Sequence, residues 1–127
     1  MTDDDYLPIL TNEFRAEEDT FLIQLRPWLH WDKIAFTRLT QAMAICCRLT
    51  AGQEKLDRWV AEGFWFIPTF VRDWSTHPNF PREHSAEYYE AAYERLDDLA
   101  YWFFHGETPY ETKSEPHRKL ITGAELG

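Results

Sequence analysis

Two groups of neighbouring carboxyl side chains are the first candidates for chemistry in this 127-residue sequence: Glu17–Glu18–Asp19 and Asp97–Asp98. Paired carboxyls perform general acid–base catalysis when they are buried and close together. Both groups lie in polar stretches of the chain, where carboxyl side chains usually face solvent. The sequence therefore offers carboxyl pairs, but without the apolar setting that acid–base catalysis needs.

The histidines and cysteines do not form a metal-binding pattern. There is no Glu-x-x-His, His-x-x-x-His or Cys-x-x-Cys motif among His30, His77, His84, His105, His117 and the two cysteines. Asp73 and His77 are one helical turn apart, but Pro78 follows at once and disfavours a helix there. We therefore expect no metal site and no cofactor.

Nucleophilic catalysis has no support either. Cys46 and Cys47 lie within AMAICCRL, a very apolar stretch, and burial raises the pKa of a thiol and makes it unreactive. The chain has no Gly-x-Ser-x-Gly motif, and its five glycines are too scattered for a phosphate-binding loop. The sequence therefore predicts a protein that is not an enzyme.

The net charge of −9 bears on the choice of partner. Such a charge argues against direct binding to nucleic acid or to an anionic membrane, and it favours a basic protein partner. The first residues, MTDDDYLPIL, lack the features of a secretory signal, and no apolar stretch reaches the roughly 18 residues that span a bilayer. Two adjacent cysteines cannot easily form a disulfide with each other, so we expect a cytoplasmic protein.

An acidic stripe is the most unusual feature of the sequence. Residues 85–106, SAEYYEAAYERLDDLAYWFFHG, show helical spacing, and one stripe of that helix carries Glu87, Glu90, Glu94, Asp97 and Asp98. Like charges three or four residues apart destabilise a helix by roughly 0.2–0.5 kcal/mol per pair. Two explanations are open. Either basic groups of the same chain neutralise the stripe (Arg72, Arg82, Arg95 or the tail residues Lys113, Arg118 and Lys119), or a basic partner does.

Aromatic side chains next to the stripe favour a partner. Tyr88, Tyr101 and Trp102 do not all fit the core-facing positions of the helix. Rings beside carboxylates bind Arg and Lys through ion pairs and cation–π contacts. The predicted partner-binding surface therefore consists of eight residues: Glu87, Glu90, Glu94, Asp97, Asp98, Tyr88, Tyr101 and Trp102.

Hydrophobic periodicity predicts the elements that carry this surface. Four helices are expected. The first starts after Thr11 or Asn12 and ends near Arg26, and the other three span 33–50, 53–74 and 85–105. Within the third, 63–71 is either a helix kinked at Pro68 or a short buried strand. We expect 1–10 and 107–127 to be loosely ordered extensions. The sum is one all-α domain over 1–127, an antiparallel bundle of about four helices in which 33–50 is the most buried.

In these features the chain resembles small, acidic, helical immunity proteins of bacteria, including those of contact-dependent inhibition systems. The likeness is carried by SAEYYEAAYERLDDLAYWFFHG. It implies an antitoxin without enzymatic activity that neutralises a basic toxin, most often a nuclease, by placing carboxylates where phosphates would bind.

Two alternatives stay open. A structural or adaptor subunit, or a homodimer, would expose an apolar patch centred on Phe64–Phe66, remote from the acidic stripe. An enzyme would have a concave pocket with buried titratable groups. An inhibitor would instead carry carboxylates and rings in one patch.

Overall fold

The computed structural model describes residues 5–111, and all regular structure within them is helical, which confirms the predicted all-α class. The elements are α1 (Tyr6–Phe14), α2 (Phe21–Leu25), α3 (Lys33–Thr50), α4 (Arg58–Ser75), α5 (Ala86–His105) and the 3-10 turn η2 (Pro109–Glu111). Within 5–111 no helix is both long and apolar enough to cross a membrane.

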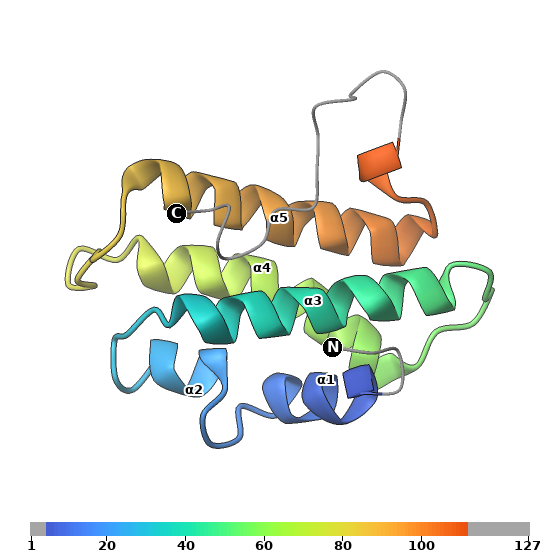
Figure 1. The fold of residues 1–127 in the computed structure, drawn as a ribbon, viewed down its shortest axis with the longest axis horizontal. Coiled ribbons are helices and arrows are strands. Elements are labelled where there is room, and N and C mark those ends of the chain that lie inside the picture. Colours follow the sequence, from blue (N-terminus) through green and yellow to red (C-terminus); the bar gives the residue numbers. More distant parts are fainter. Residues whose placement is uncertain (1–4, 112–127) are drawn as a thin grey trace.

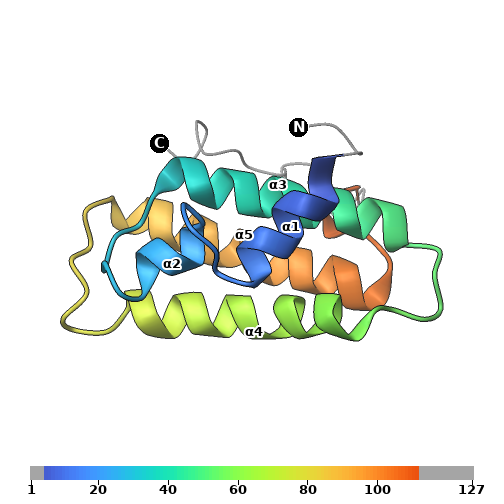
Figure 2. The ribbon, with the colours of Figure 1, turned by 90° about the horizontal axis from the view of Figure 1, so that it is seen from below.

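The three long helices form the frame of the bundle (Figure 1). α4 runs antiparallel to α3 and α5, and α5 packs against both of them. α1 and α2 lie on the opposite side from α5, where α1 packs on α3 and α2 contacts α3 and α4 (Figure 2). The fourth position of the predicted bundle is thus filled by two short helices instead of one long helix.

The predicted first helix is the main difference from expectation. α1 begins at Tyr6, where a loose lead-in was expected, and its Leu10 is fully buried. The chain then leaves the helix after Phe14, and Ala16 and Asp19 adopt positive φ angles of 53° and 63°. Non-glycine residues rarely adopt such angles, so the prediction of one continuous helix to Arg26 is wrong.

A buried carboxylate stabilises this break. Glu13 is only 1% exposed, and its Oε2 accepts a hydrogen bond of 2.9 Å from the backbone N–H of Phe21. Its Oε1 accepts a hydrogen bond of 3.1 Å from Nε of Arg38, and Nη2 of the same arginine donates to the carbonyl of Asp19. Burial raises the pKa of the Glu13 carboxyl, against the lowering effect of these hydrogen bonds. One side chain therefore joins the start of α2 to α3.

The boundaries of α3 and α5 follow common capping chemistry, whereas α4 begins at Arg58 instead of at 53, and Asp57 before it makes no side-chain capping bond. Asp32 accepts hydrogen bonds from the N–H groups of Ile34 and Ala35, and Ser85 accepts one from Tyr88. Gly106 ends α5 with a φ of 75°. α4 continues through the buried Pro68 as a single helix, so the strand alternative for 63–71 is excluded.

Trp31, in the connection before α3, is the centre of the core. Its indole is 2% exposed, and its Nε1–H donates a hydrogen bond of 2.7 Å to the hydroxyl of Tyr88 on α5. Five rings surround it with centroids 4.8 to 6.3 Å away: Phe21, Phe36, Tyr88, Tyr89 and Tyr93. This aromatic cluster connects α2, α3 and α5.

The predicted burial of α3 and its thiols is confirmed. Half of the α3 residues are buried, including Cys46 and Cys47 at 2% and 1% exposure. The Cys47 thiol contacts the carbonyl of Leu99 at 3.4 Å. Burial raises the pKa of Cys46 to about 11 and that of Cys47 further.

The first prediction concerns Trp31. Changing Trp31 to Phe removes the indole N–H and leaves the buried Tyr88 hydroxyl without its donor. We expect the free energy of unfolding, measured by denaturant titration, to fall by about 2–4 kcal/mol. The control Trp28→Phe, at a residue 73% exposed, should change it by less than about 0.5 kcal/mol. Equal stability of the two variants would contradict the central role of Trp31.

The second prediction concerns the thiols. Because both are buried and their pKa values are raised, neither should react with a disulfide reagent at pH 8 while the chain is folded. Both should react within the mixing time in denaturant, which absorbance of the released thiolate reports. Rapid labelling under native conditions would show that α3 is less buried than the structure indicates.

Candidate functional site

One face of α5 is a continuous exposed line. Glu87, Glu90, Glu94, Asp97 and Tyr101 are all exposed and follow one another at steps of three and four residues, the spacing of one helix face. We call the four carboxylates of this line the acidic ridge. At 1.5 Å per residue the ridge is about 15 Å long.

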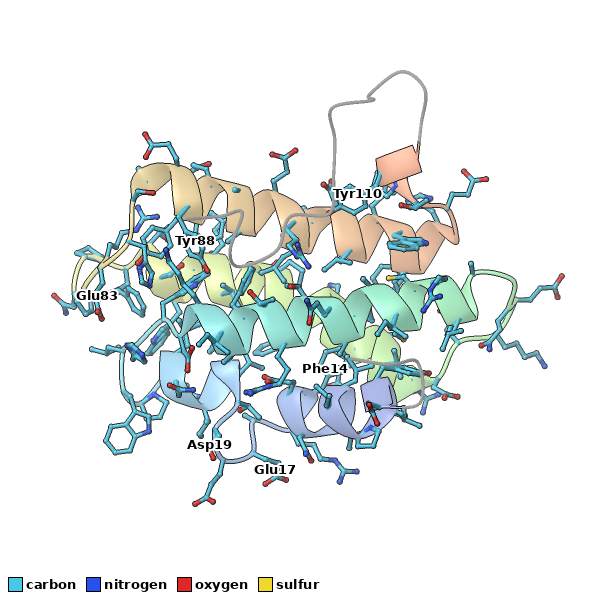
Figure 3. The ribbon with its side chains drawn as sticks, viewed as in Figure 1. Phe14, Glu17, Asp19, Glu83, Tyr88 and Tyr110 are labelled. Carbon is cyan, nitrogen blue, oxygen red and sulfur yellow. The ribbon has the colours of Figure 1, made fainter. Side chains whose placement is uncertain are left out.

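Two predicted members of the surface are buried. Asp98 is 5% exposed and Tyr88 is 1% exposed, and Figure 3 shows Tyr88 on the inner side of α5. Each is turned about 100° from an exposed neighbour, Asp97 or Glu87, because successive helical residues rotate by that angle. Burial raises the pKa of Tyr88 to about 12, although the bond from Trp31 opposes this. Asp98 and Tyr88 therefore do not belong to the exposed surface.

The other two predicted rings differ from each other. Tyr101 is 48% exposed and stacks on His105 with centroids 4.2 Å apart. Trp102 is half-buried, since Tyr110 of η2 packs on it with the two ring centroids 6.5 Å apart. Figure 3 shows Tyr110 beside this end of α5. The expected loose extension from 107 thus begins with an ordered turn, and only Tyr101 lies in line with the ridge.

The ridge is partly neutralised within the chain. Nη2 of Arg72 on α4 lies 2.6 Å from Oδ2 of Asp97, and both side chains are about half exposed. Arg82 contacts an aromatic ring, with its guanidinium carbon 4.2 Å from the centroid of Tyr89, and Arg95 is buried. The three basic tail residues named above lie outside the described residues. The internal explanation is therefore confirmed for Asp97.

The first half of the ridge differs from Asp97. Among the described residues, Glu87 and Glu90 take part in no ion pair. Glu87 lies in the first turn of α5, where the helix dipole stabilises a negative charge. Two exposed carboxylates at this end of α5 are thus available to a cation from outside.

Exposed rings on α4 were not assigned to the predicted surface. Trp65 is 72% exposed, and Trp59 and Phe66 are 40% and 45% exposed. The only signal in the sequence was the run of three aromatic residues from Phe64 to Phe66. Val60 and Phe64, four residues apart, have the spacing of one helix face, and the structure confirms that Phe64 is the buried ring of the three.

A groove of about 550 Å³ lies between α1 and α4. Its lining residues are Thr11, Phe14, Arg15, Trp59, Glu62, Gly63, Phe66 and Ile67. The two charged members, Arg15 and Glu62, are exposed, whereas the buried carboxyl of Glu13 lines a separate, smaller cavity of about 210 Å³. Glu17 and Asp19, of the first carboxyl group, point outward in Figure 3. Within 5–111 no group of three His, Cys, Asp or Glu side chains could hold a metal.

The third prediction separates the two halves of the ridge. Asp97→Asn removes the ion pair with Arg72 and should lower the free energy of unfolding by about 0.2–1 kcal/mol at low salt. Glu90→Gln relieves repulsion from Glu87 and Glu94, and it should leave stability unchanged or raise it by up to about 0.5 kcal/mol. Thermal unfolding at low and high salt measures both effects. A loss of stability in the Glu90 variant would mean that its carboxylate is stabilised within the chain.

Comparison with known proteins adds no family to this description. No protein-family model, curated protein or solved structure matches the chain. The resemblance to immunity proteins therefore stays a prediction, and the function is argued below from the described residues alone.

Proposed function

We propose that this protein is a binding protein without catalytic activity, an immunity-type inhibitor that neutralises a basic toxin through the outer face of α5. The observation that carries the proposal is the acidic ridge, with the exposed ring of Tyr101 in line with it. Carboxylates and a ring in one patch are what an inhibitor of a cationic protein needs.

The ridge has the dimensions and charge to occupy a phosphate-binding groove. It extends about 15 Å along one rigid helix, and its side chains project in one direction because they share a face. Such a single-sign row accelerates encounter with an oppositely charged protein. Tyr101, at the end of the row, supplies a ring that can pack on an Arg or Lys side chain.

Asp97 has a particular role in this proposal. Its partner Arg72 comes from α4, so the ion pair holds the end of the ridge next to Tyr101 in place before binding. A basic group of the toxin would then bind a preformed arrangement, which lowers the entropy cost of association. Glu87 and Glu90, together with Glu94, are the principal contacts.

A second candidate function is a structural or adaptor subunit that assembles through apolar contacts. The exposed rings of Trp59, Trp65 and Phe66 on α4 favour it, because large exposed aromatic groups on a small protein commonly mark a protein interface.

The fourth prediction tests the ridge as an inhibitory surface. Proteins retained by the immobilised wild-type chain are identified by mass spectrometry, and each basic one is expressed in bacteria with and without the chain. Glu87→Gln, Glu90→Gln and Glu94→Gln together should slow association with the toxin roughly tenfold or more at low salt and abolish protection of growth. The protein should stay folded, since these side chains are exposed.

A matched control changes the net charge by the same amount elsewhere. Glu17→Gln, Glu18→Gln and Glu54→Gln alter three exposed carboxylates outside α5, and this variant should protect as the wild type does. Protection by the ridge variant, or equal loss of protection in the control, would contradict the assignment of the ridge. Absence of any retained basic protein whose toxicity the chain suppresses would contradict the function itself.

A further inference from the structure

Exposed aromatic side chains gather at one end of the bundle. Among the described residues, the exposed Trp, Tyr and Phe side chains are Trp28, Trp59, Trp65, Phe66, Tyr101 and Phe104. All except Trp28 lie in the first half of α4 or the last two turns of α5. These two segments are adjacent because the helices are antiparallel (Figure 1). Trp28 lies at the opposite end, before α3.

The register of α4 and α5 places two of these rings at the same level along the bundle. The ion pair sets Arg72 opposite Asp97. Two helical turns toward this end of the bundle, seven residues in each helix, lead to Trp65 on α4 and Phe104 on α5. The rings of Phe64 and Phe103, one residue before each, stack at 4.2 Å inside the bundle. We call Trp59, Trp65, Phe66 and Phe104 the aromatic face.

The groove between α1 and α4 borders the aromatic face. Trp59 and Phe66 belong to both. At Gly63 a Cβ atom would lie only 2.2 Å from the Phe14 ring, so the absence of a side chain lets Phe14, which lines the groove, lie close to the backbone of α4. The Phe14 ring contacts Trp59 edge-on at 6.1 Å. A projecting indole and an aromatic-lined groove therefore occupy neighbouring positions on one surface.

Charge also distinguishes the aromatic face from the acidic ridge. The groove and the residues around the start of α4 carry three negative and three positive groups, namely Glu54, Asp57 and Glu62, and Arg15, Lys55 and Arg58. Glu87, at the far end of the ridge, is 17 residues from Phe104 on α5, or about 26 Å. Two copies of the chain can thus approach at the aromatic face without bringing Glu87 of one ridge close to Glu87 of the other.

We propose that the aromatic face binds a second copy of this chain, in a symmetric dimer in which Trp65 of each copy enters the α1–α4 groove of the other. A two-fold interface requires a surface that complements itself, and a projecting ring beside a groove of about 550 Å³ meets that requirement. A basic partner is less suitable here, because the local charges balance. The acidic ridge stays exposed in the dimer.

The fifth prediction is a concentration-dependent dimer that needs Trp65. In sedimentation equilibrium, the full chain should approach twice its monomer mass at high concentration, with little dependence on salt. Trp65→Ala should weaken the dimer by about 30-fold or more, the effect of an interface hot spot. The control Trp28→Ala removes a ring of nearly equal exposure, 73% against 72%, and should leave the dimer unchanged. Circular dichroism verifies that both variants are folded.

Several outcomes would overturn the proposal. One is a wild-type chain that stays monomeric at about 1 mM, where any dimer with a lower Kd would be populated. Another is a dimer that persists in Trp65→Ala and in Trp65→Glu, or one that is lost in the Trp28 control. The variant with Gln at 87, 90 and 94 should dimerise as the wild type does. Whether this variant still protects cells from the toxin therefore tests only the inhibitory function and not the dimer.

Discussion

The hydrogen bond from the Trp31 indole to the Tyr88 hydroxyl fixes how α5 is rotated in the bundle. It joins residues 57 positions apart in the sequence, and the rings around Trp31 leave little room for another orientation. Once Tyr88 faces the interior, the three- and four-residue spacing of the helix directs Glu87, Glu90, Glu94 and Asp97 outward. The surface proposed to bind a toxin is thus a consequence of a contact in the core.

Local sequence signals were sufficient for α3 and α5, and they identified α4 but placed its start five residues too early. Asp32 and Ser85, residue types that commonly cap helices, cap α3 and α5, and Gly106 ends α5. The break between α1 and α2 could not be predicted in this way. It depends on Glu13, which reads as an ordinary helix residue but is buried by a tertiary contact with Arg38 and with the N–H of Phe21. Such a contact outweighs helix propensity, and it has no local signature.

The sequence predicted which side of α5 carries the candidate site, but not which residues at the edges of that side are exposed. The spacing of acidic residues correctly identified the exposed line from Glu87 to Asp97, whereas Asp98 and Tyr88 are buried beside it. Whether a residue at the edge of a helix face is exposed depends on which helices flank it, and the sequence of a single helix does not contain this information. The pairing of Asp97 with Arg72 likewise depends on α4 continuing through Pro68 in a fixed register.

The distance along the chain between α3 and α5 has a consequence for synthesis. α1 precedes α3 and can cover one of its sides as soon as both have been made, but the side that holds Cys47 packs on Leu99. The ribosome must add 55 further residues after Thr50 before His105 completes α5, which takes about 3–11 s at synthesis rates of 5–20 residues per second. During that interval the side of α3 that packs on α5 in the folded protein lacks this partner.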